Sequence, residues 1–267
     1  MVFQFHRESG QQFEQQQLVT KDAIIPFIEE VFPIREGIPI MEIGCGEGGV
    51  LKSLMERGCV GTGVEINEQR YARAQHYLQE YLQQGQATLV RNDIFSVGFE
   101  KDFEGRFQLI VLKDVIEHLP DQERLLQRLG QLLQPGGAIF LSFPPWQMPF
   151  GGHQQVCRSK VLSLAPYFHL LPTSIYRSIL KLFNEPEGKI EQLLDIKRTG
   201  ISLEKFERLV QQTGYRAILR NLFLINPIYR YKFGLKPRRQ FKLIAGLPFL
   251  RNFLTTGCYY LLKPDSS

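Results

Sequence analysis

Short apolar runs alternate with amphipathic helical patterns along the first half of the chain. The apolar runs predict five strands, at residues 38–43, 61–66, 88–90, 107–112 and 138–143. Apolar residues at helical spacing predict helices at residues 20–32, 50–57, 67–83 and 121–133. Strands that alternate with helices in this way are typical of βαβ units. We therefore expect a doubly wound, parallel α/β sheet with its ligand site at the carboxyl ends of the strands.

The alternation stops after Pro145. Residues 145–200 contain helical patterns but no clear strand, so they predict a mostly helical insertion after the fifth strand. A helix from Ser202 and two strands at residues 215–224 and 256–262 follow. The connection between these strands, residues 226–252, is long, basic and aromatic. We expect residues 1–267 to form one domain that carries these two insertions.

The amino-acid composition limits which classes of protein this chain can belong to. The chain is 43% hydrophobic and 22% charged, which is an ordinary globular mixture. No apolar run is long enough to span a bilayer, and the start of the chain does not resemble a secretory signal, so we expect a cytoplasmic protein. The cysteines form no CxxC pair, and we expect reduced thiols rather than a disulfide framework or a zinc site.

The net charge of +5 is unevenly distributed. Residues 208–264 hold eleven bases and no Asp or Glu, whereas the rest of the chain holds 21 bases against 27 acids. A local positive field attracts phosphate groups, nucleic acid or an acidic membrane surface. A solvated basic face would give the same pattern, so both interpretations remain open.

A glycine-rich turn follows the first predicted strand and reads Glu42-Ile43-Gly44-Cys45-Gly46-Glu47-Gly48. Glycines at such a turn allow the backbone to approach a ligand closely. Glu65 ends the second strand about twenty residues later, where a carboxylate can accept the two hydroxyl donors of a ribose. A dehydrogenase would favour the spacing G-x-G-x-x-G, and Glu47 inside the turn would repel a pyrophosphate.

Three further segments accompany this turn at the ends of predicted elements. They are Asn92-Asp93-Ile94, the run from Lys113 through Asp114-Val115-Ile116-Glu117-His118-Leu119, and Leu133-Gln134-Pro135-Gly136-Gly137. After the third strand, Asp93 can accept from an adenine amino group while Ile94 packs on the ring. A chance match to all of these segments in order would be rare.

Taken together, the segments resemble the class I S-adenosylmethionine-dependent methyltransferase superfamily, closely over about residues 20–145 and more loosely over 202–263. The resemblance implies a Rossmann-like sheet of order 3-2-1-4-5-7-6, with strand seven antiparallel. It also implies S-adenosylmethionine as the cofactor, with S-adenosylhomocysteine as the product. The residues that it places around this cofactor are Glu42, Gly44, Gly46 and Gly48 at the methionine part, Glu65 at the ribose, Asp93 and Ile94 at the adenine, and Lys113 near the donor end. For Glu42, a buried acid paired with a local backbone N–H remains an equal alternative.

The resemblance implies methyl transfer to an oxygen or nitrogen of a small or lipid-linked acceptor, with residues 145–200 as a lid over the acceptor site. Because the sulfonium is already a good leaving group, the protein mainly aligns the two reactants. A hydroxyl acceptor also needs a base near its proton. His118 and His153 are the candidates that we favour, with His169, Asp114 and Glu117 as further possibilities.

Asp114, Glu117 and His118 also resemble the E-x-x-E-H pattern of metal-assisted O-methyltransferases of the ubiquinone-pathway and small-RNA types, and His153 is placed to complete such a site. Asp114, however, stands where those families have Glu, and D-V-x-E-H-L is common in relatives without a metal. We therefore assign no metal ligand. Two alternatives stay open: metal-assisted methylation of a nucleic acid end, and a non-catalytic protein that binds S-adenosylmethionine. Because no RNA-binding module is appended, nucleic acid is not the partner that we expect.

Aromatic residues interleave with bases in the basic insertion, residues 226–252. Aromatic rings beside cations are suited to a membrane interface with anionic headgroups. We expect peripheral contact with an anionic membrane or a phosphorylated lipid-linked acceptor. A sheet extension with a solvated edge is the alternative.

Overall fold

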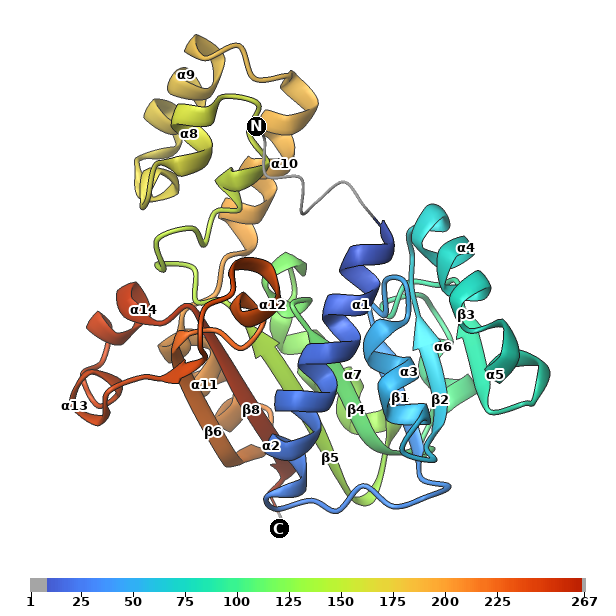
Figure 1. Ribbon diagram of the computed structural model, residues 1–267. Helices are drawn as coiled ribbons and strands as arrows, with labels where there is room; N and C mark the ends of the chain where they lie inside the picture. The colour runs from blue at the N-terminus through green and yellow to red at the C-terminus, as the bar shows by residue number, and fades with distance from the viewer. Residues whose placement is uncertain (1–8, 266–267) are drawn as a thin grey trace.

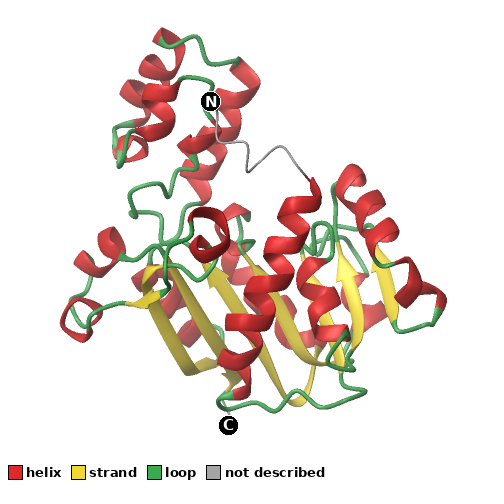
Figure 2. Cartoon of the chain, in the orientation of Figure 1, coloured by secondary structure: helices red, strands yellow, loops and turns green. Residues whose placement is uncertain are grey.

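The computed structural model describes residues 9–265, which fold around an eight-stranded sheet (Figures 1 and 2). The strands are β1 (Pro39–Ile43), β2 (Val60–Val64), β3 (Ala87–Val90), β4 (Phe107–Lys113), β5 (Leu133–Phe143), β6 (Tyr215–Ile225), β7 (Arg238–Arg239) and β8 (Gly257–Pro264). Their order is β3-β2-β1-β4-β5-β8-β6-β7, and β8 runs antiparallel to both β5 and β6. The predicted order is confirmed, because β8 occupies the place of strand seven. The short β7 extends the edge.

Helices cover both faces of the sheet because the strands bury side chains on both sides. Along β4, Leu109 and Val111 pack in one core with α2 and α3, whereas Ile110 and Leu112 pack in a second core with α7 and α11. This alternation follows from the two-residue period of a strand. The helices of the sheet layers are α1 (Ser9–Val19), α2 (Ile25–Glu29), α3 (Gly49–Met55), α4 (Glu68–Tyr77), α5 (Gln79–Gln83), α6 (Phe99–Phe103), α7 (Gln122–Leu132) and α11 (Leu203–Gln212).

Two predicted boundaries were wrong. The first helix was expected from residue 20, but α1 begins at Ser9 and continues through a π-helical turn, η2 (Thr20–Ile24), into α2. The fifth strand was expected to begin after Pro135-Gly136-Gly137, but β5 already begins at Leu133. Its pairing with β4 shifts register between Leu133 and Ala138, so these residues form an irregular start of the strand rather than a separate turn.

Residues 145–200 form the predicted helical insertion after the fifth strand. It comprises η4 (Gln154–Val156), α8 (Lys160–Leu164), η5 (Phe168–Leu170), α9 (Thr173–Leu182) and α10 (Glu187–Thr199). Figure 1 shows α8, α9 and α10 standing clear of the sheet, beyond the end to which β5 points. Tyr176, Leu180, Ile190 and Leu193 are buried in a core of the insertion's own.

The basic insertion folds into short elements at the edge of the sheet. After α12 (Tyr229–Phe233), β7 pairs with β6, and α13 (Lys242–Ala245) and α14 (Leu250–Leu254) lead back to β8. Figure 1 shows α13 and α14 projecting beyond β6. Among residues 9–265, no helix has both the length and the apolar character to cross a bilayer.

Candidate active site

The glycine-rich turn between β1 and α3 is held in a conformation that favours glycine. Gly44, Gly46 and Gly48 all have positive φ angles, of 67°, 57° and 86°. A Cβ on Gly44 would lie 2.7 Å from Cγ2 of Val115, so the turn there is closed by packing. Around a Cβ on Gly46, in contrast, no atom of the part of the chain that the structure describes lies within 4 Å. The middle of the turn therefore borders open space.

Glu65 links this turn to the end of β2. Its two carboxylate oxygens accept hydrogen bonds from the backbone N–H groups of Gly46, at 2.9 Å, and Asn67, at 2.7 Å. The residue is only 5% exposed. Because an ionised carboxylate can accept about four hydrogen bonds, these two leave capacity for two more donors.

Glu42 lies near the end of β1 and is also buried. Burial raises the pKa of its carboxyl well above the ordinary value, against the effects of a backbone hydrogen bond from Leu51 and of the nearby Lys113 charge. Its Oε2 has no hydrogen-bond partner within residues 9–265. Both interpretations of Glu42 therefore remain supported. A local N–H donates to its carboxyl group, and one carboxyl oxygen is still available to a ligand.

Asp93 and Ile94, the two residues expected at the adenine, differ in their exposure. Asp93 is exposed and accepts from the N–H of Phe95 at 2.9 Å, whereas Ile94 is only 4% exposed and packs in the core. Little of Ile94 is left for contact with a ring. Ile66, which directly follows Glu65 and was not considered in the sequence interpretation, is 66% exposed.

Lys113 ends β4 with its ammonium group paired to Asp114. Asp114 has a φ of 56°, and its N–H donates to the carbonyl of Ser142 at 2.8 Å, which fixes the turn after β4. The pKa of Asp114 is lowered: partial burial acts in the opposite direction, but the charges of Lys113 and Lys232 outweigh it. Lys232 belongs to α12, so the basic insertion reaches this end of the sheet.

Glu117, His118 and His153 come together beside Asp114, although His153 lies in the helical insertion. One ligand atom from each lies within 4.8 Å of the others, and the two imidazole rings meet edge to face at 5.0 Å. Both oxygens of Glu117 are buried and lack a hydrogen-bond partner among residues 9–265. Burial raises the pKa of Glu117 well above its ordinary value, and the Asp114 carboxylate adds to this effect. Partial burial lowers the pKa of His118, so its imidazole is neutral at pH 7.

Two residues weighed in the sequence have other roles. His169 is buried, and its Nε2 lies 2.7 Å from the carbonyl oxygen of Trp146, so it packs inside the insertion. Burial lowers the pKa of His169 to about 4. Glu47 pairs with Arg73 at 2.6 Å, so its charge is neutralised and does not by itself argue against a pyrophosphate.

A family model described as a methyltransferase domain matches residues 14–218, which is more than half of the chain. The chain is a member of the methyltransferase domain family. With the sheet order above, this confirms the class I S-adenosylmethionine-dependent methyltransferase superfamily. The family was therefore predicted correctly from the ordered sequence segments.

Curated relatives include the ubiquinone biosynthesis O-methyltransferases of Leptothrix cholodnii and Coxiella burnetii. The first is 27% identical over 116 residues and the second 29% over 118 residues. These alignments cover 43% and 44% of this chain and 48% of each relative. The chain thus spans about half the length of the curated relatives that it matches.

Solved structures show the same fold at low sequence identity. A putative sarcosine dimethylglycine methyltransferase from Galdieria sulphuraria superposes with a TM-score of 0.56 at 13% identity, over 94% of this chain and 85% of that one. The magnesium protoporphyrin IX methyltransferase of Synechocystis, solved with bound S-adenosylhomocysteine, gives 0.54 at 15% identity, over 94% and 84% of the two chains.

Proposed function

We propose that this protein transfers the methyl group of S-adenosylmethionine to an oxygen of a small or lipid-linked acceptor. The observation that carries the proposal is the cluster of Glu117, His118 and His153 beside the turn that ends β4. It brings two imidazole groups to the turn that follows β4, at the carboxyl ends of the strands. The two curated relatives, both named O-methyltransferases, support oxygen as the methylated atom.

The residues around the turn fit S-adenosylmethionine. The open space at Gly46 leaves room for the methionine part, and the unpartnered oxygen of Glu42 offers an acceptor for its ammonium group. The spare capacity of Glu65 suits the ribose hydroxyls, and the exposed Ile66 offers an apolar surface for the adenine. This fit supports Glu42, Gly44, Gly46, Gly48 and Glu65 as cofactor residues. Asp93 and Lys113 stay in the proposed cofactor site, but fewer observations support them. Ile94 is buried, so we propose that it contributes only through packing in the core.

The chemistry required of the protein is alignment and removal of one proton. With S-adenosylmethionine bound, an acceptor oxygen would attack the methyl carbon, and the carbon–sulfur bond would break with its electron pair left on sulfur. His118, whose lowered pKa keeps it neutral, would take the acceptor proton. His153 enters from residues 145–200, so we propose that this insertion covers the acceptor.

Metal-assisted transfer is the second candidate, and the same cluster favours it. A buried carboxyl without a hydrogen-bond partner, beside two imidazoles, fits a divalent cation. Glu117, His118 and His153 would hold the ion, and its charge would lower the pKa of an acceptor hydroxyl. Asp114 is already paired with Lys113, so it is not among the ligands that we infer.

Cofactor binding is tested by calorimetric titration with S-adenosylhomocysteine. We expect saturable binding that Gly46→Ala weakens at least about tenfold, because the added methyl group occupies the open space at the turn. Gly136→Ala is the matched control, since Gly136 also has a positive φ, of 79°, and free room for a Cβ. Both variants should lose similar stability, and only Gly46→Ala should lose affinity. No binding by the wild-type protein would sink the proposal.

Metal binding is tested by titrating the chelator-treated protein with Mn²⁺. If the ion binds at this cluster, Glu117→Gln should weaken its affinity at least about tenfold. Glu42→Gln, a second buried glutamate, should not. Because the ligands must be deprotonated and the pKa of Glu117 is raised, affinity should be lower at pH 6 than at pH 8. The absence of binding at pH 8 would leave His118 as a base that acts without metal.

A further inference from the structure

Large apolar side chains are exposed in one short stretch of the chain. Nine of the twenty large hydrophobic residues exposed within residues 10–265 fall between positions 233 and 254. They are Phe233, Leu235, Phe241, Leu243, Leu247, Phe249, Leu250, Phe253 and Leu254. Scattered single apolar residues are normal at a protein surface, but a concentrated group marks an interaction site. We refer to residues 241–254, which include α13 and α14, as the apolar tip.

The basic insertion itself holds bases but no acids next to the apolar tip; the acids that meet the tip, Glu204 and Glu207, belong to α11 and are paired with Arg251. Lys236, Arg238, Arg239 and Lys242 are exposed, and the whole segment 208–264 lacks Asp and Glu. Arg239 reaches Glu30, the residue that directly follows α2, at 3.3 Å. The surface therefore combines apolar side chains with a positive field.

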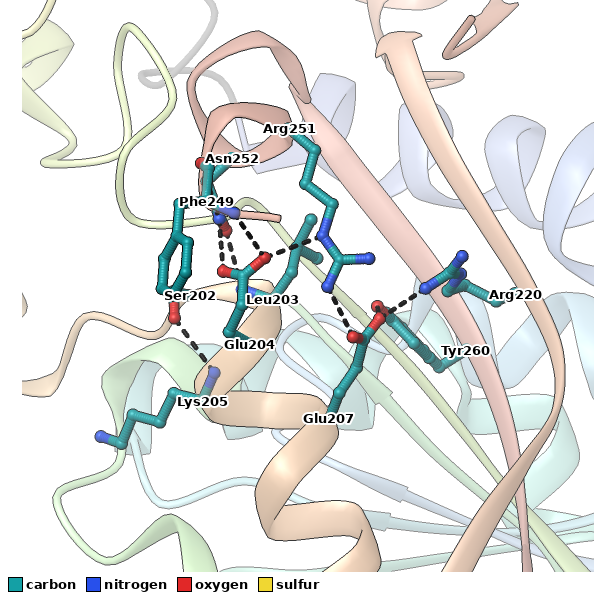
Figure 3. Close-up of polar contacts among 10 residues, drawn as sticks. All are labelled: Ser202, Leu203, Glu204, Lys205, Glu207, Arg220, Phe249, Arg251, Asn252 and Tyr260. Atoms are coloured by element: carbon teal, nitrogen blue, oxygen red, sulfur yellow. Dashed lines mark hydrogen bonds and ion pairs between the residues drawn. The ribbon is translucent and has the colours of Figure 1, made fainter. Parts of the chain in front are cut away.

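A polar network fastens the apolar tip to α11 (Figure 3). Arg251 donates to Glu204 at 2.8 Å and to Glu207 at 2.5 Å, and Asn252 donates to Glu204 at 2.5 Å. Asn252 also accepts from the N–H of Leu203 at 2.8 Å. Because Arg251 and Asn252 are buried, α14 is a fixed support rather than a loose loop.

Phe249 is held in a strained conformation on this support. Its φ is 62° and its ψ is −51°, and the N–H of Leu250 donates to the carbonyl of Pro248 at 2.7 Å. These features define a γ-turn of the rare positive-φ kind, and the N–H of Phe249 is fastened to Glu204 at 3.0 Å. Phe249 is nevertheless 71% exposed. A strained backbone conformation at an exposed aromatic residue is typical of a functional position, which indicates a role for the Phe249 side chain.

We infer that the apolar tip is a docking surface for an anionic lipid bilayer. Leucine and phenylalanine side chains can enter the interface between headgroups and acyl chains, while the neighbouring bases meet lipid phosphates. A two-fold contact between copies of this chain would bring the same basic patch together from both copies, and the repulsion between the two patches disfavours self-association. Nucleic acid would match the charge but gain little from exposed leucines.

The apolar tip also contacts the helical insertion. Tyr167, which precedes η5, donates to the carbonyl of Phe253 at 3.1 Å, and the two rings lie 6.2 Å apart. A docked tip would thus hold the insertion close to the bilayer.

The test is co-sedimentation with phosphatidylcholine vesicles, with and without phosphatidylglycerol, at low and high salt. We expect the wild-type protein to bind the anionic vesicles best and to bind them less as salt rises. Leu243→Ser should weaken binding about tenfold and Lys242→Ser about fivefold, by the usual contributions of one buried leucine and one interfacial base.

The control variants change exposed residues outside both insertions. Leu243 is 78% exposed, and Val97, in the loop between β3 and α6, is fully exposed, so Val97→Ser removes a large apolar side chain from another surface. Lys101→Ser does the same for an exposed base on α6. Equal binding to all vesicles, equal losses in variants and controls, or a dimer in sedimentation velocity that Leu243→Ser dissociates would each overturn the inference.

Discussion

At the scale of single residues, Glu65 shows how one side chain can shape a site and still remain available to it. Its carboxylate accepts from the backbone of two different loops, at Gly46 and Asn67. The residue therefore positions the glycine-rich turn whether or not a cofactor is bound. Sequence position alone predicted the contact to a ribose, but not this second, structural role.

Glu65→Ala should weaken binding of S-adenosylhomocysteine about tenfold or more, because two hydroxyl groups lose an acceptor, at about 1–3 kcal/mol. Glu68→Ala is the control, because Glu68 lies three residues further along the chain, at the start of α4, and its side chain is 82% exposed. A titration should also use a cofactor analogue without ribose hydroxyls. If the variant loses as much affinity for that analogue, Glu65 acts only on the turn.

At the scale of elements, α14 depends on α11 more than on its own sequence. Five residues are too few to form a stable helix alone, so the hydrogen bonds to Glu204 and Glu207 decide its position. Burial of Glu207 tends to raise its pKa, but donors from Tyr260, Arg251 and Arg220 hold that pKa below the usual range. The stabilisation is present at neutral pH and is lost as the pH falls through the lowered pKa.

Arg251→Met should lower the free energy of unfolding by about 2–4 kcal/mol, because it leaves two partly buried carboxylates without their shared partner. Arg239→Met removes an exposed arginine of the same insertion, paired with Glu30, and should cost only about 0–1 kcal/mol. Urea denaturation at pH 7 measures both values. Equal losses would show that the network around Arg251 contributes no more than a surface pair.

At the scale of the whole molecule, the sequence predicted best those features that depend on residues close together in the chain. The segments at the strand ends identified the family by resemblance, and that resemblance supplied the sheet order, whereas the strand pattern by itself indicated only a parallel α/β sheet. The helix at Ser9–Val19 was missed because its glutamines carry no apolar stripe. Its stability comes from tertiary contacts such as Phe13 stacked on Tyr77, with ring centres 4.2 Å apart.

The candidate site was only partly predictable for the same reason. Glu117 and His118 are adjacent in sequence, but only the resemblance to metal-assisted methyltransferases indicated that His153 would join them, because their meeting depends on how the insertion leaves β5, with His153 at a φ of 56°. The exposure of Ile66, the burial of Ile94 and the approach of Lys232 likewise depend on packing between distant segments. No residue pattern within one segment carries that information.

The separate core of α8, α9 and α10 has a consequence for how this protein can change over evolutionary time. Tyr176, Leu180 and Ile190 pack with one another and not with the two cores of the sheet. Substitutions in distant, independent cores have nearly additive effects on stability. The insertion can therefore accumulate changes, or be exchanged for another helical segment, while the sheet and its glycine-rich turn keep their stability. A lineage could in this way acquire a new acceptor without rebuilding the site for the methyl donor.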